Sequence, residues 1–358
     1  MFEFLRRDLL LILLMVAVFS CLSYAIGHLS KRTPSTNEIQ TNFLGGEHTP
    51  RAQSHADRVW REASIQKALS LDATLLSTPT IMRSDHEGNI YVLDWADFRI
   101  KMFSPDGSLL KVFGQGKGTD TAAFLNPTSF SVSAKEELWV SDPPQRKITH
   151  FSPGGKVDLV PTHREAWRIA SVRNKLITMA VPERNAAFEV YDAGEYSKSF
   201  GELLEDQSET GLVLDGNIVG DSDNQGFIYG GRLVGVIAGY TEEGKRRFAV
   251  QTIDWIPPPK IVTIGQGKKV KQNSPRAVLS MSILGNELYV LSGTRDYDAT
   301  SSGRRVMDVY DKRNGDYLFS FKLPVACTEA IVRENYIYIL GDGAVSVLRF
   351  NASTLTRS

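Results

Sequence analysis

The sequence has 358 residues, of which 42% are hydrophobic, and this suffices for one large domain or two ordinary ones. Lysine and arginine together number 41, as do aspartate and glutamate, and this neutral balance argues against a nucleic-acid-binding protein, which usually has a basic excess. The only cysteines are Cys21 and Cys327, and because Cys21 lies in an apolar N-terminal segment we expect no disulfide between them. Packing alone is therefore expected to hold the fold together.

The first predicted element is an apolar run over residues 9–29. About 20 apolar residues suffice to span a bilayer as a helix, so residues 1–30 are predicted to be a signal peptide or an uncleaved membrane anchor. Three fates stay open: retention as a single span, which we favour, cleavage at residues 23–25, or lipidation at Cys21 within a loose lipobox-like sequence.

The next stretch, residues 31–63, is polar, contains proline, glycine and serine, and has no sustained periodicity. Such a composition is typical of a linker. We expect a polar tether here, with a short helix near residues 57–63.

Two later stretches, residues 88–107 and 136–155, repeat one another with a fixed offset of 48 residues. Tyr91 returns as Trp139 and Asp94 as Asp142. Each unit has short β-prone runs separated by tight turns of the Ser-Pro-x-Gly type. This pattern predicts one four-stranded antiparallel sheet in each unit.

Weaker copies continue to the end of the chain and bring the number of units to six. Each copy has a large apolar anchor in its second strand and another in its third. The second-strand anchors are Tyr91, Trp139, Ile177, Tyr229, Tyr289 and Tyr338. The third-strand anchors are Phe103, Phe151, Tyr191, Tyr240, Tyr310 and Phe350. Repeated four-stranded sheets predict an all-β, six-bladed β-propeller over residues 64–358, whereas a β-sandwich would not repeat units of this size.

The last unit lacks a good fourth strand, because only residues 351–358 follow Phe350. Ile65, Leu69 and Leu71 lie at alternating positions just before the first unit, with Lys67 as the one break. We therefore predict that residues 64–75 supply the outer strand of the last blade and close the ring without an exposed sheet edge.

Residues 79–155 resemble NHL repeats, which form six-bladed propellers. The resemblance is carried by a proline, the sequence Gly-Asn-Ile-Tyr-Val-Leu-Asp over 88–94, the Arg-Ile-x-x-Phe pattern over 99–103, and the Pro-Asp-Gly turn. The later units hold Ala180, Arg232 and Ser292 where the first two have an aspartate, so the resemblance there concerns architecture only.

Long loops on a rigid scaffold usually carry binding sites, and here they connect the second strand to the third and one blade to the next. We call the side they share the long-loop face. Several arginines and aromatic residues fall in these loops, and guanidinium groups there are suited to hold carboxylate or phosphate. The candidate binding residues are Arg99, Arg146, Arg184, Arg232, Arg295, Arg304, Trp95 and Tyr297, with Trp255 as a further stacking surface. The alternative for Arg99 and Arg146 is that they only pair with Asp94 and Asp142 in their own blades.

The sequence gives little support for catalysis. Related propeller families, the gluconolactonase-like and amidating-lyase-like groups, hold a metal in the channel, but the six histidines here show no ligand spacing. The acidic run Asp221-Ser222-Asp223 lacks the later glutamate of a calcium loop, and the basic loop 265–271 is expected to be solvated. We therefore predict no catalytic residue, no metal and no cofactor.

The resulting hypothesis is a membrane-tethered propeller, extracytoplasmic in the periplasm or at the cell surface, that binds a protein, peptide or glycan partner on its long-loop face. Its membrane contact would be made by residues 9–29, and nucleic acid is excluded as a partner. The alternative is a propeller-type lyase or lactonase with a metal in its central channel.

Overall fold

The computed structural model describes most of the chain after the predicted anchor. The described residues are 37–43, 45, 49–53, 58–183, 186–205, 210–221, 223, 225–264, 267–271, 274–293, 304–350 and 356–357. The apolar run 9–29, with its three alternative fates, lies outside them. Within the described part of the chain, no helix is long and apolar enough to cross a membrane.

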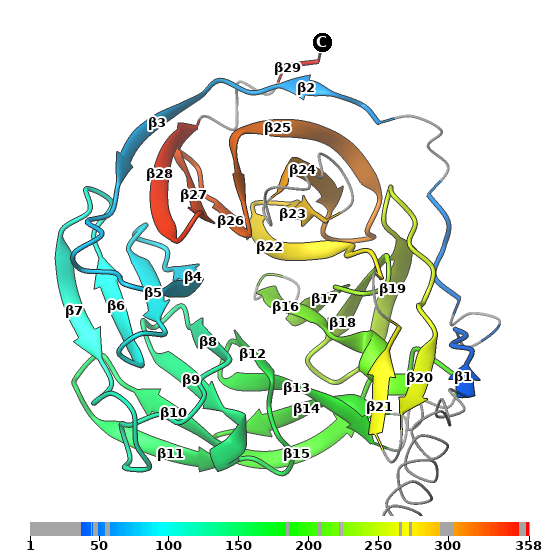
Figure 1. Ribbon diagram of the computed structural model, residues 1–358, viewed down its shortest axis with the longest axis horizontal. Helices are drawn as coiled ribbons and strands as arrows, with labels where there is room; N and C mark the ends of the chain where they lie inside the picture. Colours follow the sequence, from blue (N-terminus) through cyan, green and yellow to red (C-terminus); the bar gives the residue numbers. More distant parts are fainter. Residues whose placement is uncertain are drawn as a thin grey trace, which may run out of the picture.

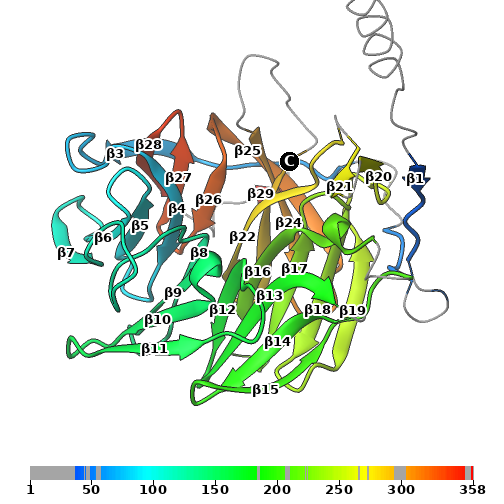
Figure 2. The same cartoon turned by 60° about the horizontal axis from the view of Figure 1, so that its bottom comes forward.

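The described residues form six four-stranded antiparallel sheets that are arranged as blades around a central axis (Figure 1). Consecutive inner strands contact one another all the way round, from the first blade to the sixth and back to the first. The molecule is therefore a β-propeller, and the β-sandwich alternative is wrong. Figure 2 shows the same ring tilted so that its lower edge comes forward, with neighbouring blades packed face to face.

Each blade contains four strands in order from the axis outward, and the blades are numbered 1 to 6 in chain order. The inner strands are β4 (Pro79–Ser84), β8 (Ser129–Val132), β12 (Arg168–Val172), β16 (Gly216–Asp221), β22 (Val278–Leu284) and β26 (Glu329–Val332). The second strands are β5 (Ile90–Asp94), β9 (Leu138–Asp142), β13 (Lys175–Glu183), β17 (Gly226–Gly231), β23 (Glu287–Ser292) and β27 (Tyr336–Gly341). The third strands are β6 (Arg99–Phe103), β10 (Lys147–Phe151), β14 (Ala186–Asp192), β18 (Val236–Thr241), β24 (Arg304–Asp311) and β28 (Ala344–Phe350). The outer strands are β7 (Leu109–Phe113), β11 (Val157–Pro161), β15 (Glu195–Phe200), β19 (Arg246–Gln251), β25 (Tyr317–Cys327) and β3 (Ile65–Ser70).

The anchors predicted from the repeat lie in the second and third strands of the six blades, as expected. All of them are buried except Trp139, which is half-buried. Among the described residues, six clusters of buried apolar side chains lie between neighbouring blades, one at each junction. A single sheet cannot bury both of its faces, and this packing of blade on blade supplies the core.

The predicted closure of the ring is confirmed. Strand β3, from before the first blade, pairs antiparallel with β28 as the outer strand of blade 6, with Ile65 opposite Phe350 and Leu69 opposite Val347. The ladder shifts register between Val347 and Leu348, where Lys67 breaks the apolar alternation. The two ends of the ring are thus joined by hydrogen bonds within one sheet.

Inner strands would leave unpaired backbone groups along the channel, and side chains of the preceding blade satisfy several of them. Ser131 accepts a hydrogen bond from the backbone N–H of Ser171 at 2.9 Å. Ser280 does the same for Ala330 at 3.0 Å, and Glu329 accepts from the N–H of Met82 at 2.5 Å across the closing junction. Side-chain hydrogen bonds therefore link consecutive blades near the axis.

Much of the stretch that we predicted to be a free tether lies against the propeller instead. Residues 49–53 and 58–62, here called the strap, run round the outside of blades 4 and 5 toward blade 6 (Figure 1). Arg51 pairs with Val250 of blade 4, and Trp60 pairs with Ser320 of blade 5, both as parallel bridges. Strand β2 (Arg61–Glu62), in the strap, then pairs with β29 (Thr356–Arg357) near the C-terminus. Isolated bridges leave no periodicity in the sequence, which is why the pattern predicted a tether.

Arg58 fixes the strap to blade 5 through a buried side chain that is only 4% exposed. It forms ion pairs with Asp254 and Asp308 and donates to the Ser320 hydroxyl at 2.9 Å. Ser320 in turn donates to Asp308 at 2.6 Å. Burial raises the pKa of Asp308 to about 6, and the Arg58 guanidinium opposes that rise.

A small sheet lies outside the ring beside blade 4 (Figure 1). It is formed by β1 (Asn37–Ile39), β20 (Ile261–Ile264) and β21 (Gly267–Val270). The basic loop that we expected to be solvated therefore contains a strand. Lys271, just after it, pairs with Glu38 at 2.8 Å, as does Lys260.

Candidate functional site

The long-loop face carries a cavity of about 530 Å³ on the side of blades 1 to 3. Its walls come from the starts of inner strands, the ends of second strands and the connectors between them, which all meet at one end of the ring. We call it the mouth cavity, and it is lined by Thr80, Ile81, Trp95, Asn126, Pro127, Thr128, Trp167, Arg168, Met179, Ala180, Gly211, Leu212 and Asp215. A volume of this size is typical of small-ligand sites.

Two tryptophans from different blades line the mouth cavity. Trp95 follows the second strand of blade 1, packs on Phe98 with ring centroids 4.9 Å apart, and is 37% exposed. Trp167 immediately precedes the inner strand of blade 3 and is half-buried, and its backbone N–H donates to the Met179 carbonyl at 2.8 Å. Thr128 donates to the Trp167 carbonyl at 3.1 Å and so ties blade 2 to this position. Broad apolar surfaces are thereby held on a rigid frame.

Arg168 is the cationic group of the cavity wall. Its Nη1 donates to the Trp167 carbonyl at 2.8 Å, and its Nη2 lies 3.3 Å from Asp215. Arg232 reaches the other oxygen of Asp215 at 3.8 Å. Burial, together with the charges of Arg232 and Arg83, holds the pKa of Arg168 below its usual value, although Asp215 opposes this shift.

A second charged pair lies on the channel wall beneath the mouth. Arg83 of blade 1 donates to Glu329 of blade 6 at 2.8 Å. Burial raises the pKa of Glu329, and Arg83 is the main opposing influence. The two residues line a narrower cavity of about 190 Å³, which inner strands of all six blades surround.

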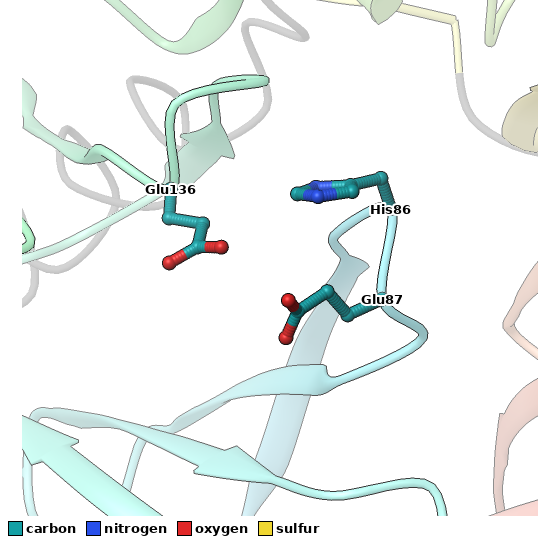
Figure 3. A group of neighbouring side chains, drawn as sticks. All are labelled: His86, Glu87 and Glu136. Carbon is teal, nitrogen blue, oxygen red and sulfur yellow. The ribbon is translucent and has the colours of Figure 1, made fainter.

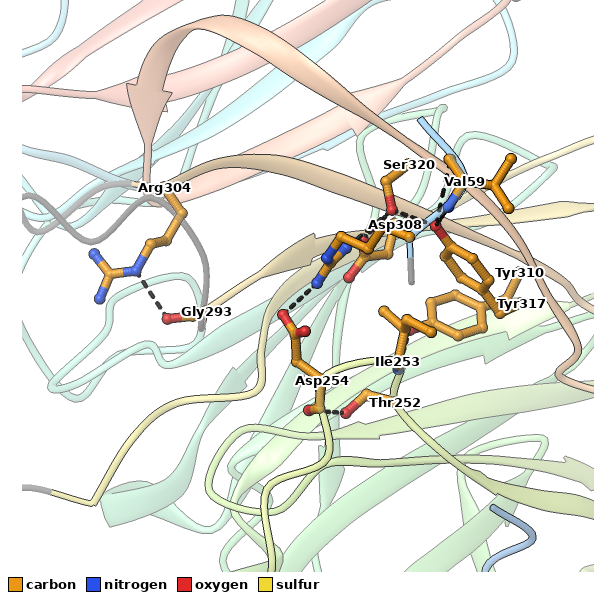
Figure 4. Close-up of polar contacts among 11 residues, drawn as sticks. Val59, Thr252, Ile253, Asp254, Gly293, Arg304, Asp308, Tyr310, Tyr317 and Ser320 are labelled. Carbon is orange, nitrogen blue, oxygen red and sulfur yellow. Dashed lines mark hydrogen bonds and ion pairs between the residues drawn. The ribbon is translucent and has the colours of Figure 1, made fainter. Parts of the chain in front are cut away.

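The four arginine candidates within the described residues have different surroundings. Arg232 lies next to Asp215 of the cavity wall but does not itself line the mouth cavity, whereas Trp95 does. Arg304 is buried and donates from Nε to the carbonyl of Gly293 at 2.8 Å (Figure 4). Arg99 and Arg146 are exposed and do not line the mouth cavity. Three further candidates, Arg184, Arg295 and Tyr297, lie outside the described residues.

Asp94 and Asp142 have a structural role that does not involve the two arginines we considered as their partners. Asp94 accepts from the backbone N–H groups of Ser77 and Thr78, and Asp142 accepts from those of Leu125 and Asn126. Each aspartate thus fixes the connector that enters its own blade. A short ion pair of 2.7 Å joins Asp94 to Lys101. Burial would raise the pKa of Asp94, but Lys101 and the backbone donors hold it below its usual value.

Trp255, the further stacking residue of the sequence analysis, lies on the connector after blade 4. It is 39% exposed and its ring faces Phe43 at 5.9 Å. It does not line the mouth cavity.

The opposite end of the channel carries a different group of side chains (Figure 3). His86 and Glu87 lie in the first turn of blade 1, and Glu136 lies in the corresponding turn of blade 2. Their ligand atoms are within 4.8 Å of one another, and all three side chains are exposed. An imidazole and two carboxylates are a donor set that divalent metals accept. Sequence reasoning missed this group, because the histidine and the second glutamate are 50 residues apart and meet only when two blades pack.

Only part of the mouth cavity could be predicted from the sequence. Trp95 was found because it lies in a repeat loop. Trp167 and Arg168 were not, because blade 3 has lost most of the repeat signature. Thr128, which the 48-residue offset aligns with Thr80 of blade 1, directly precedes the inner strand of blade 2 as Trp167 precedes that of blade 3, and this shared position is the signal that would have pointed to Trp167.

Comparisons with known proteins support the architecture alone. No protein-family model and no curated protein sequence matches the chain. A solved structure from Bacteroides fragilis NCTC 9343, designated an exported protein, matches 84% of this chain and 98% of its own with 12% identity and a TM-score of 0.55. Virginiamycin B lyase from Staphylococcus aureus matches 88% of this chain and 99% of its own with 11% identity and a TM-score of 0.47. A streptogramin B lyase matches 81% and 98% with 12% identity and a TM-score of 0.46.

The likeness to the exported protein, the one of these three with a TM-score above 0.5, concerns the fold alone, because the identity is only 12%. The finer resemblance to NHL repeats is not confirmed by any family match.

Proposed function

We propose that the protein is a membrane-tethered, extracytoplasmic β-propeller that binds a protein, peptide or glycan partner on its long-loop face. The observation that carries this proposal is the mouth cavity, where Trp95, Trp167 and Arg168 from two different blades line one hollow. Tryptophan and arginine are the residues most enriched where binding energy concentrates. The apolar run 9–29 supports the membrane tether and the location outside the cytoplasm.

Binding of the full-length protein in detergent to peptide and glycan arrays tests this proposal. We expect ligands whose capture falls at least about tenfold in the Trp95→Ala/Trp167→Ala variant, which corresponds to a loss of about 1.4 kcal/mol. Trp255→Ala is the matched control, because Trp255 is exposed to the same degree but lies outside the mouth cavity. Equal capture by all three proteins would place the partner elsewhere and overturn the proposal.

The alternative function, a lyase or lactonase, now rests on one observation, the group of His86, Glu87 and Glu136 at the far end of the channel. Metal analysis of the full-length protein after dialysis against Mn²⁺ or Zn²⁺ tests it. The alternative requires about one ion per chain, lost in the Glu87→Gln/Glu136→Gln variant. Equal ion content in the variant and the parent would remove the support for this alternative.

A further inference from the structure

The apolar and the charged residues of the mouth cavity line different parts of its wall, and this arrangement indicates what kind of group it accepts. Most of its wall is apolar, formed by Ile81, Trp95, Pro127, Trp167, Met179 and Leu212. Its charged lining residues, Arg168 and Asp215, lie together beside blades 3 and 4. A ligand that fills the cavity therefore meets apolar surface over most of its body and charge at one side.

The charges around this side are not balanced. Three guanidinium groups, those of Arg83, Arg168 and Arg232, face two carboxylates, those of Asp215 and Glu329. Glu329 forms an ion pair with Arg83 at 2.8 Å. Asp215 is shared between Arg168 and Arg232, and the net charge of the five groups is one positive unit.

The contacts of Asp215 are long and incomplete. Its oxygens lie 3.3 Å from Arg168 and 3.8 Å from Arg232, whereas charge-assisted hydrogen bonds usually measure about 2.7–2.9 Å. Because these distances are long, part of each guanidinium group lacks a close anion. Asp215 itself is 42% exposed to solvent. In addition, Nε of Arg232 is buried and has no hydrogen-bond partner among the described residues.

We propose that the mouth cavity binds a large apolar or aromatic group that carries a free carboxylate, with Arg168 receiving the carboxylate beside Asp215 and the neighbouring Arg232 adding positive charge. The inference rests on the proposed function and specifies the ligand of the same site. A planar guanidinium matches a carboxylate with two parallel N–H donors, and the added anion neutralises the excess positive charge. The indole rings of Trp95 and Trp167 provide the apolar surface. This chemistry occurs in small aromatic acids and at the free carboxyl end of a peptide with an aromatic last residue.

Calorimetric titration of the full-length protein with N-acetyl-tryptophan and with N-acetyl-tryptophan amide tests the carboxylate directly. The two probes differ at a single group, which is an anionic carboxylate in the acid and a neutral carboxamide in the amide. We expect the acid to bind at least about tenfold more tightly than the amide, and Arg168→Met to reduce that ratio to nearly one. A tetrapeptide, acetyl-Ala-Ala-Ala-Trp with a free carboxyl end, distinguishes the sources, because tighter binding than the single residue indicates a peptide terminus and equal binding indicates a small acid.

Asp215→Asn distinguishes loss of the carboxylate contact from a simple folding defect, because this variant is expected to bind more tightly. Removing the competing carboxylate should strengthen binding of the acid severalfold and leave binding of the amide unchanged, a gain that misfolding does not produce. Trp255→Ala should change neither probe.

Three results overturn the inference: equal binding of acid and amide, binding of neither probe, or weaker binding of the acid by Asp215→Asn. If acid and amide bind equally and Trp95→Ala weakens both, the carboxylate assignment fails while the proposed binding function stands. If Trp95→Ala leaves binding of both unchanged, the probes do not occupy the mouth cavity and the inference fails, while the array experiment still decides the proposed function.

Discussion

The two halves of the ring are built from similar blades but differ in what covers their outer edges. Along blades 4 to 6, the N-terminal chain covers the outer edges: the strap lies on β19 and β25, and β3 completes blade 6. Along blades 1 to 3, none of the described segments pairs with the outer edges of β7, β11 and β15. The mouth cavity lies over this second half.

If the proposed function holds, ring closure and partner binding depend on different residues. The strapped half holds the buried ion pairs of Arg58, which stabilise the ring. The unstrapped half has exposed apolar side chains on its outer edges, such as Leu110 at 52%, and presents its tryptophans on the long-loop face. Changes in one half should therefore affect stability, and changes in the other should affect binding.

The largest effect is expected from Arg58→Ala. Removing this side chain leaves Asp254 and Asp308 close together without their cation, and breaking a buried ion pair in this way costs about 3–5 kcal/mol. Urea unfolding at pH 7 measures the loss, which should be smaller at pH 5 because the carboxyl groups then take up protons.

Arg51→Ala is the matched control within the strap. Its ion pair with Asp316 is exposed on both sides, so we expect a loss below about 1 kcal/mol. Equal losses for the two variants would show that burial of Arg58 does not matter to closure.

The second prediction concerns the pH dependence of folding. Asp308 has a folded-state pKa of about 6, raised from 3.8 by burial, so the native protein keeps a proton there that the unfolded chain has lost. The associated stability is fully present below about pH 4 and is lost as the pH rises through 6, by ~3 kcal/mol for a shift of this size.

Unfolding curves between pH 4 and 7.5 for the parent protein and Asp308→Asn check this window. The difference in unfolding free energy between them should change across it. A constant difference would mean that Asp308 titrates normally and that Arg58 outweighs its burial.

The third prediction is that substitutions in the two halves have independent effects on the free energy of unfolding. Trp95→Ala should lower the free energy of unfolding by less than about 1 kcal/mol, because the ring is partly exposed. Combined with Arg58→Ala, its effect on stability should add within about 0.5 kcal/mol, since the two sites share no partner. A larger coupling would show that the strap and the mouth cavity are energetically linked.

The smallest expected effect concerns serine side chains that link neighbouring blades in both halves of the ring. Ser131 links blade 2 to blade 3, and Ser280 links blade 5 to blade 6, each by accepting a backbone N–H. Substitution of either by alanine should cost about 1 kcal/mol, the usual net value of one hydrogen bond. A much larger loss at Ser280 alone would mean that the strapped half also depends more on its links near the axis.

Periodicity in the sequence predicted the ring well, because each blade needs large apolar side chains at the same two places. Tyr229 and Tyr310 belong to units that have lost the repeat signature, yet both lie buried in the expected strands. The role of residues 64–75 followed from counting strands, since a blade with three strands requires a fourth.

The strap and the site were harder to predict for physical reasons. Arg58 sits in a polar, aperiodic stretch, and its partners Asp254 and Asp308 lie about 200 residues away or more. The mouth cavity depends on how blades 1 to 3 pack, so Trp167 and Arg168 gave no signal within their own unit. Arg99 and Arg146 were expected there from their loops, but the position of a loop residue does not fix the direction of its side chain.

Hydrogen exchange of the full-length protein, with and without the tightest ligand from the arrays, tests whether the partner binds at the mouth cavity. We expect slower exchange in residues 95–98, 126–128, 167–168 and 211–215 around the mouth cavity, with the strap unchanged. Slower exchange in the strap, or in the turns at 85–88 and 133–137 at the other end of the channel, would contradict this expectation.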